Sequence, residues 1–349
     1  MDAILSPRRR RLMLGMGALA LGGCGRAPAS SQAAGYTQFA GATMGSTYSV
    51  RLKSAGPDEE ALRAVVQAAL DDVDQRMSMF RTDSELSVFN RAAGGSAVPL
   101  SEPLFAVLAA ADRVSRWSEG AFDVTVAPLV ERWGFGTRNV RTVPAAAVLA
   151  TERSRVDWRS LSFDDARRTV TKRQSGMQAD LGGIAKGYGV DRAAAALDAR
   201  GVTDYMLEVG GEVRTRGVNA TGAAWRIGIE EPDASPQRAR WIVPVSGRAM
   251  ATSGDYRNYF VEDGKRFSHE IDPLSGAPIR HSLCSVTVVA DTCMQADALA
   301  TALIVLGANR GRALAEASGI AAQFIERRPE GGFRDSMTAA FAEVKAARS

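Results

Sequence analysis

The sequence predicts an α+β protein. Segments with strand character outnumber segments with helical periodicity, and the two kinds do not alternate regularly, as they would in a doubly wound sheet. With 349 residues, the chain can bury one large core or two moderate ones. Its 46% hydrophobic and 23% charged residues are typical of a folded domain.

The N-terminal segment predicts a signal for export. "SPRRRR" followed by "LMLGMGALALGG" has the charged start and the short apolar run of a secretion signal. "LGGC" ends at Cys24 and resembles the lipobox of bacterial lipoproteins, so we expect residues 1–23 to be a signal peptide and Cys24 to carry lipid. An ordinary cleaved signal is one alternative, and the arginines also resemble a twin-arginine signal. Residues 24–36 suit a flexible tether.

Charge and residue counts narrow the classes of function. Residues 1–23 carry +3 of the net charge of +4, so the remaining chain gives a nucleic-acid role no electrostatic support. Two histidines, His269 and His281, are too few for a histidine-rich zinc site. Cys284 and Cys293 could pair in an oxidising compartment, but two buried, unpaired thiols are the favoured state.

The predicted elements begin with strand character at both ends of residues 36–54, around a glycine-rich middle. A helix follows from Asp58, with acidic residues before its apolar stripe. A second helix begins near Ser101, with Pro103 in its first turn. The stripes predict core positions: Leu62, Val65, Val66, Ala69, Leu70, Val73 and Met77 in the first helix, and Leu104, Leu108 and Trp117 in the second.

Strands dominate after residue 200. Residues 205–217 read as a strand interrupted at Gly210 and Gly211 and then resumed, and residues 224–232 and 240–254 as further strands. The β-branched run at 284–290 predicts a buried strand. A helix over 294–307 then ends at Gly307, and a second helix (308–319) and a strand (320–326) follow.

The segment "DLGGIAKGYGVD" (180–191) carries the densest chemical signal. Gly182 and Gly183 permit close approach of the backbone, and the helix that follows presents free N–H groups. The spacing is neither a Walker A motif nor GxGxxG. Lys186 is one of five lysines in an arginine-rich chain, which favours a need for a compact charge. The segment is either a phosphate-binding site or a simple turn.

Two further motifs carry polar groups. In "ADALATAL", Asp297 and Thr301 lie four residues apart on one helix face, and both are oxygen ligands suited to magnesium held together with phosphates. The alternative is a first-turn acid and a threonine bonded within its own helix. "SHEIDPLSGAP" (268–278) places His269 and Asp272 in a turn before a strand.

Eight motifs together resemble the FAD:protein FMN transferase family (ApbE-type flavin transferases), from about residue 37 to the C-terminus. In chain order they are "TMGSTYSV", "MSMFRTDSELSVFN", "GAFDVTVAPL", "DLGGIAKGYGVD", "VGGEVRTRG", "ATSGDYRNYF", "HEIDPLSGAP" and "QADALATAL". The resemblance implies a transferase domain over residues 37–349, with two sheet-containing lobes and an FAD site between them.

The resemblance also implies magnesium-dependent transfer of FMN from FAD to a threonine or serine hydroxyl of an acceptor protein, with release of AMP. The magnesium ligands it implies are Gly183 (through its carbonyl), Asp297 and Thr301. The positions that match FAD contacts are Met44, Phe80, Ala121, Phe122, Asp123, Asp180, Lys186 and Ile271. The chain departs from the family in having Phe80 for a frequent tyrosine, Glu212 for aspartate and Ser275 for threonine.

The acceptor hydroxyl needs a base, and His269 is our candidate because imidazole titrates near neutrality. Asp272 is the alternative base, or a residue that orients the turn. The implied partners are FAD, an acceptor such as a subunit of Na+-translocating NADH:quinone reductase or of an Rnf-type complex, and the bacterial membrane, reached by the lipid anchor on its periplasmic side. An FAD pyrophosphatase and a non-catalytic FAD-binding lipoprotein are the alternative functions.

Overall fold

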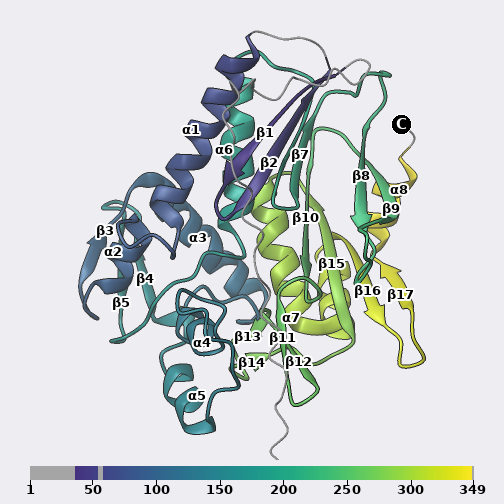
Figure 1. Ribbon diagram of the computed structural model, residues 1–349. Helices are drawn as coiled ribbons and strands as arrows, with labels where there is room; N and C mark the ends of the chain where they lie inside the picture. The colour runs from purple at the N-terminus through teal and green to yellow at the C-terminus, as the bar shows by residue number, and fades with distance from the viewer. Residues whose placement is uncertain (1–35, 54–57, 348–349) are drawn as a thin grey trace, which may run out of the picture.

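An eight-stranded antiparallel sheet is the largest element of the computed structural model, which describes residues 36–53 and 58–347 (Figure 1). Its order is β1-β2-β6-β7-β10-β15-β16-β17, and neighbouring strands run antiparallel throughout. The strands are β1 (Thr37–Thr43), β2 (Ser46–Leu52), β6 (Tyr205–Val209), β7 (Glu212–Arg216), β10 (Ala249–Gly254), β15 (Leu283–Ala290), β16 (Ala321–Arg327) and β17 (Phe333–Met337). The predicted α+β class is therefore confirmed.

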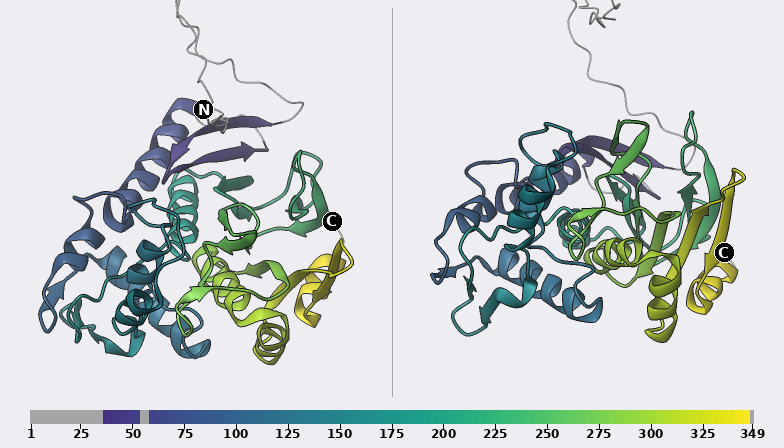
Figure 2. Two further views of the ribbon diagram at one scale, coloured as in Figure 1. Left: turned by 60° about the horizontal axis from the view of Figure 1, so that its bottom comes forward. Right: turned by 90° about the horizontal axis from the view of Figure 1, so that it is seen from below.

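Three helices cover one face of this sheet: α1 (Glu59–Met77), α6 (Ala185–Asp198) and α7 (Cys293–Ala317) (Figures 1 and 2). Asp58 caps α1 by accepting a hydrogen bond from Glu60 N–H. The predicted stripe faces inward, with Leu62, Val66, Leu70, Val73 and Met77 buried. No helix of the described residues is long and apolar enough to cross a membrane.

The opposite face is covered by the hairpin of β8 (Trp225–Glu230) and β9 (Ala239–Val245) and by α8 (Ala339–Ala346). β15 is therefore buried along its whole length: Val286 and Val288 pack in the cluster with α7, and Cys284 and Val289 in the cluster with α8. A strand covered on both faces needs an uninterrupted apolar run, which is the pattern that predicted it.

A second lobe contains α2 (Glu85–Arg91), α3 (Glu102–Trp117) and the three-stranded sheet β3-β5-β4. Its strands are β3 (Ala97–Pro99), β4 (Leu161–Asp164) and β5 (Thr169–Lys172), and α4 (Ala127–Arg132), α5 (Ala146–Arg153) and a 3-10 turn (Trp158–Ser160) lie beside them. Ser101 caps α3 as expected. The core of this lobe continues to α6 and α7 through Ala185, Ala298 and Ala302, so two sheet-containing lobes share one packed junction.

Two short hairpins follow β10 in the chain: β11 (Tyr259–Glu262) with β12 (Lys265–Ser268), and β13 (Ile271–Asp272) with β14 (Ala277–Pro278). The two helices predicted around Gly307 form the single element α7, whose backbone leaves helical geometry at Gly307 (φ 77°, ψ 169°). The expected stop is therefore present, and the next helix begins without a loop.

Both described cysteines are free and buried. Cys284 Sγ lies 3.2 Å from the Ile325 carbonyl oxygen, and Cys293 Sγ lies 3.7 Å from the Val213 carbonyl oxygen. This matches the favoured expectation of two unpaired thiols. Residues 1–23 and Cys24 lie outside the described residues, so the signal and lipid predictions are not addressed by the fold.

Candidate active site

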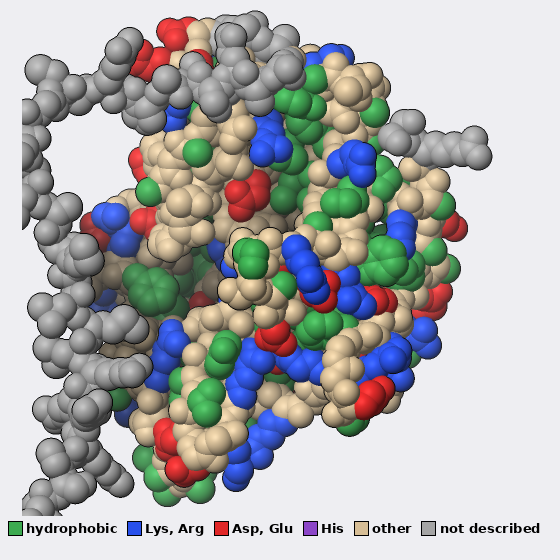
Figure 3. Space-filling model, turned by 45° about the vertical axis from the view of Figure 1, so that its right-hand side comes forward, with side chains coloured by type: hydrophobic (Ala, Val, Ile, Leu, Met, Phe, Trp, Pro, Cys, Tyr) green, Lys and Arg blue, Asp and Glu red, His purple; other side chains and the backbone are tan. Residues whose placement is uncertain are grey.

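A cavity of about 930 Å³ has walls from both lobes, a volume typical of a small-molecule site. Acidic and basic side chains are interspersed over the hollowed face seen in Figure 3. Most of the residues singled out from the sequence line this cavity: Phe80, Ala121, Phe122, Asp123, Asp180, Gly183, Lys186, His269, Ile271, Asp297 and Thr301. Segments more than 200 residues apart in the chain therefore meet as the motifs predict.

Two of the predicted residues do not line the cavity. Met44 occupies the turn between β1 and β2, and its sulfur packs toward Gly189 of α6. The Asp272 carboxylate accepts hydrogen bonds from Leu274 N–H (2.9 Å) and Ser275 N–H (3.3 Å). These bonds hold the turn after β13, and they favour the orienting role of Asp272 over the role of base.

The glycines at the start of α6 allow this helix to approach α7. A Cβ on Gly187 would lie 2.3 Å from the Cys293 carbonyl oxygen, so only glycine fits there. The Gly187 N–H then donates to Asp297 Oδ2 at 2.9 Å. Just before the helix, Asp180 accepts from Gly182 N–H at 2.7 Å, and burial raises the Asp180 pKa. The glycine-rich segment thus serves helix packing as well as the cavity.

Gly183, Asp297 and Thr301 form an arrangement that fits a magnesium ion. A Cβ on Gly183 would lie 2.9 Å from Thr301 Oγ1, so the backbone at Gly183 passes directly beside the threonine hydroxyl. Asp297 is 3% exposed, and its Oδ1 accepts no hydrogen bond from the described part of the chain. Ser253 Oγ lies 3.1 Å from Thr301 Oγ1. A buried carboxylate oxygen with hydroxyl and carbonyl neighbours is a donor set suited to magnesium.

Lys186 on α6 forms an ion pair with Glu212, at the start of β7. The Glu212 side chain is 2% exposed, and its Oε2 has no hydrogen-bond partner among the described residues. Burial lowers the Lys186 pKa, but the charges of Glu212 and Asp297 outweigh this effect and the net pKa is raised. Burial raises the Glu212 pKa to about 7, although Lys186 opposes the shift. Lys186 is therefore a cation already held by one carboxylate.

Asp123 organises the wall that carries Ala121 and Phe122. Its carboxylate accepts from Thr125 N–H (2.8 Å), Thr125 Oγ1 (2.7 Å) and Trp158 N–H (3.0 Å). Burial raises the Asp123 pKa to about 6. Because both carboxylate oxygens already hold protein donors, Asp123 ties residues 121–126 to the 3-10 turn.

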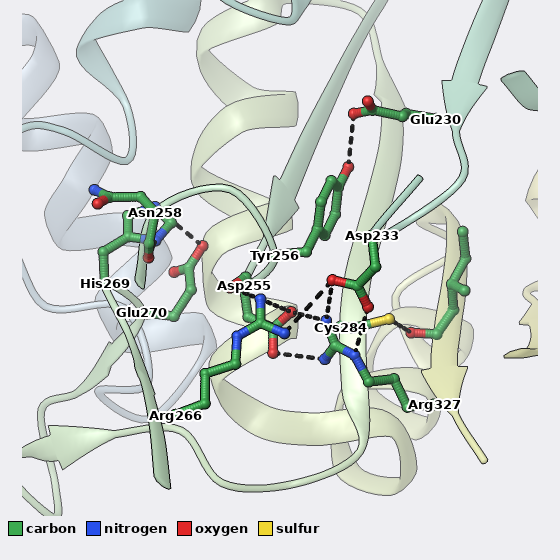
Figure 4. Close-up of polar contacts among 11 residues, drawn as sticks. Glu230, Asp233, Asp255, Tyr256, Asn258, Arg266, His269, Glu270, Cys284 and Arg327 are labelled. Carbon is green, nitrogen blue, oxygen red and sulfur yellow. Dashed lines mark hydrogen bonds and ion pairs between the residues drawn. The ribbon is translucent and has the colours of Figure 1, made fainter. Parts of the chain in front are cut away.

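His269 and Glu270 lie side by side at the cavity wall (Figure 4). The Asn258 carbonyl oxygen accepts from His269 N–H at 3.0 Å and lies 3.2 Å from His269 Nδ1. Since a carbonyl only accepts, Nδ1 carries the proton and Nε2 has a free lone pair. Burial lowers the His269 pKa to about 4, and Glu270 Oε1 lies 3.8 Å from Nε2.

Sequence reasoning did not assign a role to three cavity residues: Glu212, Ser253 and Glu270. Glu212 was noted only as a departure from the family, and Glu270 stands inside a quoted motif, next to His269. A glutamate in the sequence does not show whether its carboxylate has a partner in the fold. In the structure, the lack of full pairing is what distinguishes Glu212 and Glu270.

Comparisons with known proteins agree with this arrangement. Residues 44–324 match the model of the ApbE family. The chain is 40% identical to the FAD:protein FMN transferase of Vibrio cholerae, over 87% of this chain and 91% of the relative, and 40% identical to that of Haemophilus influenzae, over 88% and 90%. The structure of the flavin transferase ApbE from Vibrio cholerae aligns with a TM-score of 0.81 and 38% identity, over 88% of this chain and 99% of the other.

An apo crystal structure of the Pseudomonas stutzeri flavinyl transferase ApbE aligns equally well, with a TM-score of 0.81 and 41% identity over 90% of this chain and 98% of that chain. The two-lobed α+β fold is thus that of solved flavin transferases. The chain belongs to the ApbE family.

Proposed function

We propose that this protein is a FAD:protein FMN transferase, which moves FMN from FAD to a threonine or serine hydroxyl of an acceptor protein and releases AMP with the help of magnesium. The observation that carries the proposal is that the Gly183 backbone passes beside Thr301 in a cavity large enough for a dinucleotide. The same cavity is lined by Asp297, whose Oδ1 accepts no hydrogen bond from the described residues. Family membership supports the flavin and the protein acceptor.

The cavity needs added positive charge to accept a diphosphate. Three of its acidic side chains, Glu212, Glu270 and Asp297, are buried, and Lys186 is paired with Glu212. A magnesium ion held by Asp297, Thr301 and the Gly183 carbonyl would supply charge neutralisation and would polarise the attacked phosphorus.

The protein's own groups would orient the reactants. Lys186 would interact with the phosphates, and Phe80, 66% exposed at the cavity, offers an aromatic face to a ring system. His269 Nε2 would accept the proton of the acceptor hydroxyl as its oxygen attacks the FMN phosphorus, because Nδ1–H is held by Asn258 and leaves Nε2 unprotonated.

The test is incubation of the full chain with FAD, magnesium and a purified acceptor subunit of a Na+-translocating NADH:quinone reductase or of an Rnf-type complex. Mass spectrometry should show the mass of an FMN phosphoester on one threonine or serine, with an equal amount of AMP. A matched incubation with a chelator should show neither product.

The two alternative functions give different products in the same assay. An FAD pyrophosphatase would release FMN and AMP at the same rate with and without acceptor, because water would replace the protein hydroxyl. A non-catalytic flavin carrier would bind FAD and release neither. The unpaired Asp297 oxygen disfavours the carrier, since simple flavin binding does not require a buried carboxylate beside the phosphates.

We also propose that the mature protein is a lipoprotein anchored through Cys24 to the bacterial membrane and facing the periplasm. The support is the arginine-led apolar segment that ends in "LGGC". Cys24→Ser should move the protein from the membrane fraction to the soluble fraction. Intact-mass analysis of membrane-extracted wild-type protein should show lipid on Cys24, and an unmodified Cys24 there would refute the anchor.

A further inference from the structure

Glu270 is a buried carboxyl group for which the described part of the chain supplies no hydrogen-bond donor. Its side chain is 10% exposed, it lines the cavity, and the ionisable group beside it is the His269 imidazole, with 3.8 Å between Oε1 and Nε2. The chain bends at His269 between β12 and β13. Two consecutive side chains can therefore face one cavity, whereas a regular strand would send them to opposite faces.

The surroundings of Glu270 favour its neutral form. The Asp255, Lys186 and Asp297 charges reach it, and its burial, followed by the negative charge of Asp255, raises its pKa to about 8. The Asp255 carboxylate is itself occupied by Arg327, which donates two hydrogen bonds of 2.8 Å to it. Figure 4 shows that this pair lies apart from the His269 side of the carboxyl group.

The surroundings of His269 act in the opposite direction. Its burial and the positive charge of Lys186 oppose protonation, while Asp255 and Asp180 favour it more weakly. The two neighbours thus rest as a neutral acid and a neutral base at pH 7. Two titratable groups whose environments separate them in this way form an acid and base pair in many active sites.

We propose that Glu270 is the proton donor to the departing AMP and acts as the acid partner of His269, the base of the proposed function. This inference rests on the proposed transfer of FMN. It gives a role to a carboxyl group whose burial without a donor is otherwise a cost to folding.

The proton and bond balance of the step closes on this pair. The acceptor oxygen forms a bond to the FMN phosphorus, and its proton moves to His269 Nε2. The bond between that phosphorus and the bridging oxygen breaks, the electron pair stays on the AMP oxygen, and this oxygen takes the Glu270 proton. The imidazolium of His269 then returns a proton to the Glu270 carboxylate through one water molecule, because the 3.8 Å between Nε2 and Oε1 exceeds the reach of a direct transfer, and both resting forms are restored.

The test compares wild-type protein with Glu270→Gln in single-turnover release of AMP from FAD, with the acceptor subunit named above. Glutamine keeps the shape but cannot give up a proton, so we expect a rate about 100-fold lower at neutral pH. The wild-type rate should fall above the Glu270 pKa of about 8, and the variant should lack this alkaline fall. FAD affinity, measured by flavin fluorescence, should change less than about threefold because binding uses other groups.

Glu326→Gln is the matched control. As whole residues Glu326 and Glu270 are each 8% exposed, but Glu326 on β16 is paired with Arg334 on β17 and does not line the cavity. The control should keep the rate and the alkaline fall. Infrared difference spectra at neutral pH should show a protonated-carboxyl band in wild type and control that is absent in Glu270→Gln.

Three results would overturn the inference. One is a Glu270→Gln rate equal to wild type with the alkaline fall intact. Another is a loss of FAD affinity as large as the loss of rate, which would show a binding or structural role. A wild-type protein that transfers FMN normally yet lacks the carboxyl band would show that Glu270 is ionised. If wild-type protein releases no AMP, the proposed function itself fails and the inference fails with it.

Discussion

Two groups of charged side chains lie close together in this protein and differ in how their charges are paired. The paired cluster (Asp233, Asp255, Arg266 and Arg327) balances two acids with two bases: Arg327 bonds both acids and Arg266 lies 3.5 Å and 3.8 Å from them (Figure 4). Among the cavity acids (Glu212, Glu270 and Asp297), only Glu212 forms an ion pair with Lys186, and each acid keeps at least one oxygen that accepts no hydrogen bond from the described residues.

The difference separates structural charge from charge that awaits a ligand. A buried ionised group is costly unless it is paired, so the paired cluster meets its own requirement within the fold. The cavity acids are not fully paired within the fold, so a bound cation or a proton must offset the cost of burying their charge. This comparison supports the proposed metal site and the proposed acid role independently of any motif.

The largest expected effect comes from removing the carboxylate of the metal site. Asp297→Ala leaves a hydroxyl and a carbonyl to hold a doubly charged ion, so the transfer rate should fall by two to three orders of magnitude, roughly the loss seen when one transition-state stabilising group is removed. FAD affinity should fall less. The measurement is AMP release at limiting magnesium, and a near wild-type rate would make Asp297 a helix-capping acid only.

Breaking the paired cluster should instead affect stability. Asp255→Ala leaves Arg327 and Arg266, both partly buried, with only the more exposed of their two acids, Asp233, which should reduce the free energy of unfolding by about 3 kcal/mol. The variant should keep its rate per folded molecule. Urea denaturation measures the loss, with Glu330→Ala as control, because the Glu330 pair with Arg328 spans 3.9 Å at 69% exposure and should contribute nothing measurable.

Thr301→Val sharpens the metal assignment with a smaller effect. Valine keeps the shape of threonine and removes one oxygen. We expect the transfer rate to fall about tenfold, which corresponds to the net free energy of about one hydrogen bond. Ser253→Ala, which removes only the neighbouring hydroxyl at 3.1 Å, should lose less. If Ser253→Ala has the larger defect in transfer, Ser253 and not Thr301 is the hydroxyl that matters.

Glu212→Gln tests the excess of negative charge among the cavity acids. Neutralising this carboxylate should tighten binding of FAD in a chelator by about threefold to tenfold, because one acid fewer faces the diphosphate. Fluorescence titration measures the affinity. Weaker binding would contradict the prediction and show that Glu212 is needed mainly to position Lys186.

The smallest expected effect is a pH dependence of stability. The Glu270 pKa of about 8 lies above its usual 4.5, so between these values the folded protein holds a proton that the unfolded chain has lost. The contribution of Glu270 to the free energy of unfolding therefore falls as pH rises from 4.5 to about 8. The His269 pKa of about 4 lies below its usual 6.5, so the contribution of His269 to the free energy of unfolding rises as pH rises from about 4 to 6.5. The two trends oppose each other below pH 6.5.

Above pH 6.5 the His269 trend ends and the Glu270 trend continues, and comparison with a variant at Glu270 isolates it from Glu212, whose pKa is about 7. Wild-type protein should therefore lose stability between pH 6.5 and about 8 relative to Glu270→Gln, as measured by urea denaturation across this range. Parallel curves for the two proteins would mean that Glu270 titrates as an exposed carboxyl group does.

The sequence by itself determined the local features. The apolar spacing from Asp58 to Met77 is enough to define α1, and the unbroken apolar run of 284–290 to define a strand covered on both faces, because periodicity depends on neighbours in the chain. The motifs likewise located most of the cavity residues, since each short segment carries its chemistry with it.

Only the tertiary structure decided which charges have partners. Arg327 reaches Asp255 across 72 residues, and the backbone at Gly183, in the turn before α6, passes beside Thr301 of α7, so no local pattern reports either contact. Met44 shows the same limit, because its motif is present but its side chain packs toward α6. Glu270 and Asp255 look alike in the sequence. The physical reason for their difference is that burial and pairing, which set the cost of a charge, depend on segments far apart in the chain.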